Sequence, residues 1–144
     1  MIVVDTNVIA YLLIAGTFTK DAQALRVSEP EWVAPRLWLD EFLNILATSE
    51  RNDLMTRAAA DQTLALACEL MEDCSYDLPA QRILATARRT SCTAYDSQYV
   101  CLAEDLGVKL YTYDKRVLTN CPDIAQKPPK TDHCNPEEGA SQFD

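Results

Sequence analysis

This 144-residue sequence has little histidine, no paired cysteines and no glycine-rich loop, which several common catalytic, metal and nucleotide sites require. Its one histidine, His133, lies in a polar segment near the C-terminus, so we expect no Ser-His-Asp or Cys-His catalytic pair in the folded part. The 6 cysteines are dispersed and form no CxxC pair, which argues against structural zinc and favours reduced thiols. No glycine-rich segment ends in Gly-Lys-Ser or Gly-Lys-Thr, which excludes a P-loop.

Long apolar runs are also missing. The longest early run, residues 8–15, is far shorter than the ~20 residues that span a bilayer, and no basic region precedes it. We therefore expect a protein without a membrane segment, located in the cytoplasm. Hydrophobic residues make up 48% of the chain and glycine only 3 residues, which favours a helix-rich globular fold.

Basic residues are outnumbered by acidic ones. Lys and Arg total 13 against 22 for Asp and Glu, which gives a net charge of −9. Because affinity for phosphates rests mainly on Lys and Arg, this balance argues against tight non-specific binding of nucleic acid. The conflict is smaller if some of the carboxylates surround cations, which reverse the local field.

Short apolar segments alternate with helical patterns along the chain. Strands are predicted at residues 2–4, 32–34, 75–78 and 109–112, and helices at 6–15, 20–28, 37–48, 53–72, 79–89, 93–106 and 115–120. This alternation predicts an α/β sandwich around a central parallel sheet. We expect residues 1–126 to form one domain and residues 127–144, which are polar and contain Pro-Pro, to form a disordered tail.

Two acidic residues lie just past the ends of predicted strands. Asp5 comes after the strand at 2–4, and Asp114 comes after the strand at 109–112. In parallel sheets of this kind, ligands bind at the carboxyl ends of the strands. The alternative for each acid is a purely structural role, as a helix cap or a turn residue.

A third acid lies in the predicted helix at 37–48. At about 100° per residue, Glu41 falls at the edge of the apolar stripe of this helix, where a carboxylate is partly desolvated. Asp40 points nearly opposite and can pair with Arg36, four residues back. Glu41 is therefore the functional candidate of the two.

The fourth acid is Asp96, in the segment Thr-Ala-Tyr-Asp at 93–96. The spacing from Thr93 fits a capping box, so helix initiation is again the structural alternative. However, Asp96 lies among apolar residues on the inward face of its helix, whereas Asp105 points outward.

Convergence of these four acids would have a chemical consequence. Like charges ~5 Å apart repel by roughly 3 kcal/mol per pair at an effective dielectric constant near 20, so the cluster must take up protons or bind a cation. Oxygen ligands without His or Cys select Mg²⁺ or Mn²⁺ over zinc. Mg²⁺ with free water positions suits phosphate chemistry.

The sequence resembles the PIN-domain nucleases, especially the VapC-like toxins of toxin–antitoxin pairs. Four segments in order carry the resemblance: V-V-D-T-N-V-I at 3–9, L-D-E-F-L-N-I-L at 39–46, T-A-Y-D-S-Q-Y-V-C-L-A-E-D-L-G at 93–107 and Y-T-Y-D-K-R-V-L at 111–118. The resemblance covers residues 1–125. It implies a three-layer α/β/α sandwich, homodimers and, for the toxins, an antitoxin protein that covers the site.

The implied activity is Mg²⁺- or Mn²⁺-dependent endoribonuclease cleavage of RNA by water, with 5′-phosphate and 3′-hydroxyl products. The residues carried over as catalytic and metal-binding are Asp5, Glu41, Asp96 and Asp114. Supporting positions are Thr6, Asn7 and Thr112. Candidate RNA contacts, for which ordinary surface charge is the alternative, are Arg88, Arg89, Lys115 and Arg116.

Three other interpretations remain. A phosphotransfer enzyme of another α/β family would typically carry a second acid two residues after Asp5, where this sequence has Asn7. A catalytically idle PIN-fold interaction module would keep the fold and act through protein contacts alone. A housekeeping RNA-processing nuclease would share the chemistry without an antitoxin.

Overall fold

A computed structural model describes residues 1–131 of the chain, in which five parallel strands form one sheet of order β3-β2-β1-β4-β5. The strands are β1 (Ile2–Val4), β2 (Trp32–Pro35), β3 (Ser75–Tyr76), β4 (Leu110–Tyr111) and β5 (Ala125–Gln126). The helices are α1 (Thr6–Leu13), α2 (Thr19–Ser28), α3 (Leu37–Arg51), α4 (Arg57–Leu70), α5 (Ala80–Thr90), α6 (Ala94–Leu106) and α7 (Lys115–Asn120).

β1 is the central strand, and its sequence explains that position. Its residues are apolar and β-branched without alternation, and all of them are buried, as in strands covered on both faces. Val3 lies opposite Val33 of β2 on one side and opposite Leu110 of β4 on the other. β1 therefore anchors both halves of the sheet.

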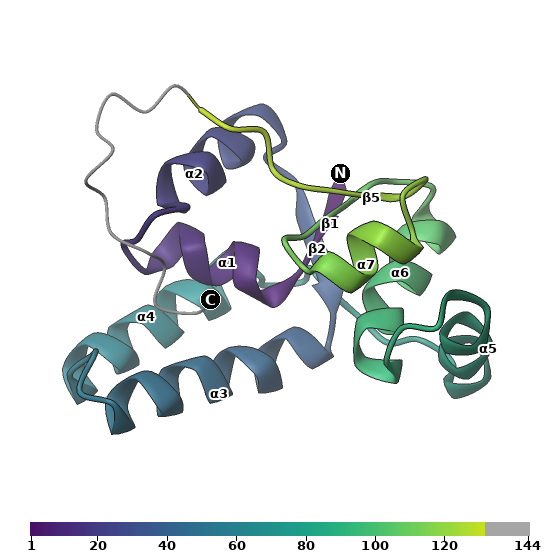
Figure 1. Cartoon of the computed structure of the whole chain (residues 1–144). Helices are drawn as coiled ribbons and strands as arrows, with labels where there is room; N and C mark the ends of the chain where they lie inside the picture. Colours follow the sequence, from purple (N-terminus) through teal and green to yellow (C-terminus); the bar gives the residue numbers. More distant parts are fainter. Residues whose placement is uncertain (132–144) are drawn as a thin grey trace.

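Helices cover both faces of the sheet, which confirms the predicted three-layer α/β/α fold. α1 to α4 lie on one side of the central strands, and α5 and α6 lie on the other (Figure 1). α6 packs directly on β1, β2 and β4, and α5 packs on α6. The core between the layers includes the fully buried Val4, Ile9, Phe42 and Val100.

The strand order creates a specific point for a ligand. From β1 the chain moves outward to β2 and β3, then crosses the sheet to β4 and β5 on the other side of β1. In open α/β sheets, ligands bind at the carboxyl ends of the strands where the strand order reverses. Here that point lies between β1 and β4.

Pro35 belongs to the sheet and not to the helix that follows it. It is the last residue of β2 and lies opposite Tyr76 of β3 in a parallel ladder. The next residue, Arg36, donates its backbone N–H to the Tyr76 carbonyl at 2.9 Å, which extends the pairing. The helix begins at Leu37, as predicted, because the chain at 35–36 is still hydrogen-bonded to β3.

Two elements differ from the prediction. The helix expected from residue 53 begins at Arg57, because Asp53 has a left-handed backbone (φ 56°) and the Thr56 hydroxyl caps the helix by accepting from the Ala59 N–H. β5 was not predicted. It is only two residues long, too short to give a periodic signal.

Beyond β5, the chain continues across to α2 (Figure 1). There the backbone N–H and the hydroxyl of Thr131 donate to the buried Asp21 carboxylate at 2.8 and 2.9 Å. The rest of the predicted tail, residues 132–144 with His133, lies outside the described residues. Within residues 1–131 the cysteines are free thiols, and none of the helices has the length and apolar character needed to cross a bilayer.

Candidate active site

All four predicted acids line one cavity of about 540 Å³, together with Thr6 and Asn7. The topology explains this convergence. Asp5 and Asp114 follow the neighbouring strands β1 and β4, and Glu41 lies in the second turn of the helix that follows β2. α6 leads back to the start of β4, so its first turn, which contains Asp96, lies at the carboxyl edge as well.

Asp5 is fixed by two hydrogen bonds that use different oxygens. As the N-cap of α1, it accepts from the Val8 N–H at Oδ1 at 3.0 Å, which confirms the capping geometry. Its Oδ2 accepts from the hydroxyl of the buried Thr112. The Thr112 oxygen in turn accepts from the Asp114 N–H at 3.0 Å. Thr112 therefore connects the ends of β1 and β4.

The environment of Asp5 opposes its ionisation. Burial raises the pKa of Asp5 from 3.8 to about 6, and the charges of Glu41 and Asp114 act in the same direction. Hydrogen bonds from Thr112 and Val8 offset part of this effect. The ionised carboxylate is therefore poorly compensated by the protein alone.

Asp96 shows the same conflict. Its N–H donates to the Thr93 hydroxyl at 3.0 Å, which confirms that Asp96 lies in the capped first turn of α6. Burial raises its pKa, and the charges of Asp114 and Glu41 raise it further, against a hydrogen bond with Thr93 and the charge of Arg116.

Glu41 is held by two hydroxyl groups. Its Oε1 accepts from Tyr99 at 2.6 Å and from Thr6 at 3.1 Å, and the two hydroxyl oxygens lie 2.7 Å apart. Thr6 and Tyr99 each have one hydroxyl proton, so only two of these three contacts are hydrogen bonds at any one time. The two shorter distances favour an arrangement in which Thr6 donates to Tyr99 and Tyr99 donates to Glu41. Burial and the Glu41 charge raise the pKa of Tyr99 well above 10.0, which keeps it a donor.

Sequence reasoning did not identify Tyr99 as part of the site. The available signal was its position three residues after Asp96 on the inward face of the same helix, where a tyrosine hydroxyl needs a polar partner. Tyr99 is only 4% exposed. Its partner, however, lies 58 residues away, so the pairing depends on how α3 and α6 pack.

Asp114 and Asp40 are exposed and lie at the cavity rim. Asp114 caps α7 by accepting from the Val117 N–H at 2.9 Å. The predicted pairing of Asp40 with Arg36 is wrong, because Arg36 instead pairs with Asp77 at 2.8 Å. The backbone of Arg36 is bonded to β3, which places its side chain beside the residue that follows Tyr76.

The donor chemistry of the cavity fits a hard divalent cation. Its ionisable ligands are carboxylates, with polar oxygens from Thr6, Asn7 and Asn44 nearby. As the side chains stand, no three carboxylate, thiolate or imidazole groups of residues 1–131 already converge on one ion position. Mg²⁺ is commonly held by one or two carboxylates plus waters and substrate phosphates, so a closed protein cage is not required.

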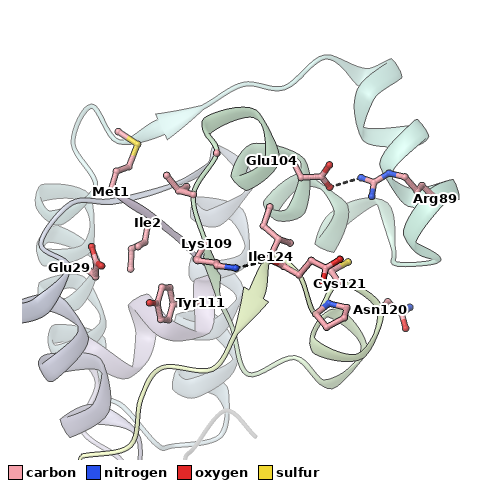
Figure 2. Close-up of a pocket in the computed structure, with 14 residues that line it drawn as sticks. Met1, Ile2, Glu29, Arg89, Glu104, Lys109, Tyr111, Asn120, Cys121 and Ile124 are labelled. Carbon is pink, nitrogen blue, oxygen red and sulfur yellow. Dashed lines mark hydrogen bonds and ion pairs between the residues drawn. The ribbon is translucent and has the colours of Figure 1, made fainter.

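The four predicted RNA contacts lie in different places. Lys115 and Arg116 line a cavity that adjoins the acids. Arg88 is an exposed residue of α5. Arg89 lines a separate cavity of about 690 Å³, near the amino ends of β1 and β4, and there it pairs with Glu104 (Figure 2). Only the first two are therefore placed to contact a ligand of the acid cavity.

A family model described as the PIN domain matches residues 2–121. The chain belongs to the PIN domain family. PIN domains are generally nucleases, so the carboxylate cavity belongs to a fold that is generally used for hydrolysis of nucleic acids. The search among curated proteins found no match.

Two solved structures share the PIN fold with this chain. PAE2754 from Pyrobaculum aerophilum is 21% identical with a TM-score of 0.66, and the match covers 85% of this chain and 81% of that one. A toxin–antitoxin complex from Klebsiella pneumoniae contains a chain that is 15% identical with a TM-score of 0.61, and the match covers 91% of this chain and 100% of that one. At these identities the likeness concerns the fold.

The raised pKa of Asp5 predicts a pH-dependent stability. Because its pKa is about 6 in the folded protein against 3.8 ordinarily, the folded state holds more protons between these values, and the free energy of unfolding falls as pH rises. A pKa difference of one corresponds to about 1.4 kcal/mol, and solvent access reduces the full effect to about 2 kcal/mol. Urea unfolding in EDTA should show that the free energy of unfolding of wild type falls by this amount, relative to that of Asp5→Asn, between about pH 4 and pH 7. A difference between the two proteins that stays constant over this range would contradict the prediction.

The bond from Tyr99 to Glu41 predicts a second stability effect. Tyr99→Phe removes a buried hydroxyl that donates to a carboxylate, and we expect the free energy of unfolding to fall by about 1.5 kcal/mol. Tyr95→Phe is the matched control, since Tyr95 is on the same helix but 64% exposed, and it should change stability by less than about 0.5 kcal/mol. Equal stabilities of the two variants in urea unfolding would show that the Tyr99 bond contributes nothing.

Proposed function

We propose that this PIN-domain protein is an endoribonuclease that depends on Mg²⁺ or Mn²⁺ and hydrolyses phosphodiester bonds in RNA. The observation that carries the proposal is the shared cavity of Asp5, Glu41, Asp96 and Asp114 at the β1/β4 edge. The pKa of Asp5 and that of Asp96 are raised by burial and by neighbouring acids. A divalent cation would remove this repulsion.

The four carboxylates keep oxygens for a cation. Asp114 uses Oδ1 for the α7 cap, and Glu41 uses Oε1 to accept from the Tyr99 hydroxyl. The second oxygen of Asp114 is therefore free to bind a cation, and that of Glu41 is free to bind a cation or to accept a proton. Each Asp5 oxygen accepts one hydrogen bond and retains a second lone pair. We expect Asp5 and Asp96, with Glu41 or Asp114, to hold one or two cations.

The chemistry follows from this arrangement. A divalent cation, when bound, lowers the pKa of a coordinated water for attack on phosphorus and offsets charge on the leaving oxygen. Glu41, fixed through Oε1 by Tyr99, presents Oε2 as the atom that accepts a proton. Attack by water needs no 2′-hydroxyl. The new P–O bond to water forms as the bond from phosphorus to the 3′-oxygen breaks, and the leaving 3′-oxygen takes up a proton, so the products carry a 5′-phosphate and a 3′-hydroxyl.

The biological role that we infer is that of the toxin in a toxin–antitoxin pair. The support is the match over the whole length of a chain from a toxin–antitoxin complex. On this proposal a cognate antitoxin covers the acid cavity, the protein forms a homodimer, and it acts on RNA in the cytoplasm. A housekeeping nuclease or an idle interaction module remain the alternatives, and the following experiments separate them.

The cleavage assay tests the chemistry with matched acids. Purified protein should cleave single-stranded RNA in Mg²⁺ or Mn²⁺, and Asp5→Asn and Asp96→Asn should each lower the rate at least about 100-fold, because each removes a cation ligand. Asp105→Asn is the control, since Asp105 is on the same helix as Asp96 but pairs with Arg82 away from the cavity, and it should keep the wild-type rate. Gel analysis of end-labelled RNA measures both rate and end groups.

Cleavage that survives EDTA, or equal activity of Asp5→Asn and wild type, would contradict the mechanism. A measurement independent of cleavage is the melting temperature, because a ligand that binds the folded state raises it. Mn²⁺ should stabilise wild type and Asp105→Asn but not Asp5→Asn.

The toxin role predicts a growth phenotype. Expression of the wild-type chain should arrest bacterial growth, and co-expression of the protein encoded directly upstream of it should restore growth. Asp5→Asn, expressed to the same level, should be harmless because it cannot cleave. Normal growth on strong expression of active protein would favour the housekeeping nuclease instead.

A further inference from the structure

A second cavity adjoins the one that the four acids line. Its volume is about 840 Å³, and the two cavities share Asn7, Asp96 and Asp114 as a common wall. We call the second cavity the aromatic groove. It is lined by three aromatic residues and three cations: Tyr11, Phe18, Tyr113, Lys115, Arg116 and Lys127.

The aromatic residues of the groove form one cluster of tilted rings. The ring centroids of Phe18 and Tyr113 lie 4.5 Å apart, and those of Phe18 and Tyr11 lie 5.0 Å apart. Tyr11 is buried at 2% exposure and supports the cluster from α1, whereas Phe18 and Tyr113 are partly exposed. Because these two come from different loops and contact each other, the ring surface is held in place before any ligand binds.

The cations of the groove are available to an anion. Among residues 1–131, Lys115, Arg116 and Lys127 form no ion pair, whereas Arg36 and Arg89 each pair with an acid elsewhere on the surface. The chain as a whole has a net charge of −9. Three unpaired cations in one groove therefore make a local site for phosphates in a protein that otherwise repels them.

We propose that the aromatic groove binds the single-stranded segment of RNA beside the cleaved bond. One base stacks on Phe18 and Tyr113, and the phosphates contact Lys115, Arg116 and Lys127. Bases stack on aromatic side chains only when they are unpaired, so the groove selects single-stranded over duplex RNA. The inference rests on the proposed ribonuclease function, because the shared wall of Asp96 and Asp114 makes the groove a continuation of the acid cavity.

Binding in EDTA, where no cleavage is expected, tests the stacking. Fluorescence anisotropy compares a single-stranded RNA decamer with an abasic decamer of equal charge, and wild type should bind the first about tenfold more tightly. Phe18→Leu keeps an apolar side chain but removes the ring face, and it should bind both decamers equally. Tyr76→Leu removes a partly exposed ring that lines neither cavity and should keep the tenfold difference.

Salt dependence tests the cations. Each phosphate contact with single-stranded nucleic acid contributes about 0.7 to the slope of log K against log salt concentration. Lys127→Gln and Arg116→Gln should each lower the slope by about this amount. Arg88→Gln removes an exposed cation outside the groove and should leave the slope unchanged.

The outcomes separate the two proposals. If wild type cleaves RNA with Mg²⁺ but Phe18→Leu and Lys127→Gln bind both decamers as wild type does, the groove inference is overturned and the nuclease function stands. If the stacking and salt effects occur but no metal supports cleavage, the groove binds RNA and the proposed function fails. If a decaglutamate peptide binds as tightly as the RNA decamer and displaces it, the groove binds acidic polymers in general, and the inference is overturned.

Discussion

The hydrogen bond from Thr112 to Asp5 connects the two halves of this PIN domain at its ligand-binding edge. Asp5 follows β1 and Thr112 follows β4, and the Thr112 oxygen also accepts from the Asp114 N–H. These strands are neighbours at the point where the strand order reverses. Together with the backbone hydrogen bond from the Asp5 N–H to the Tyr111 carbonyl at 3.2 Å, this buried hydroxyl holds the two loops that carry Asp5 and Asp114 side by side. The shape of the acid cavity depends on these contacts.

The crowding of like charges at this edge is only partly offset by the backbone. α1, α6 and α7 all begin there, and a helix N-terminus favours a nearby negative charge by about 0.3–1 kcal/mol. Despite this, the pKa of Asp5 and that of Asp96 are both raised. Desolvation and like-charge repulsion are therefore the larger effects, and the site is left short of positive charge.

The sequence predicted what depends on local pattern and missed what depends on packing between distant segments. Asp5 and Asp114 could be identified because buried strands end shortly before them, and Glu41 because it borders an apolar helix face. The bond between Tyr99 and Glu41 spans 58 residues, and the pairing of Arg36 with Asp77 spans 41. Both follow from how helices and strands pack, which no periodicity encodes.

Capping alone does not account for Asp5. Asparagine caps a helix N-terminus about as well as aspartate, and it would accept the same Val8 N–H without carrying a charge. The aspartate instead brings a desolvated carboxylate beside Glu41 and Asp114, which lowers stability at neutral pH. Folded proteins are stable by only about 5–15 kcal/mol, so a residue with this cost needs a compensating role. A bound cation would provide it, because the same negative charge that destabilises the folded protein attracts a metal ion.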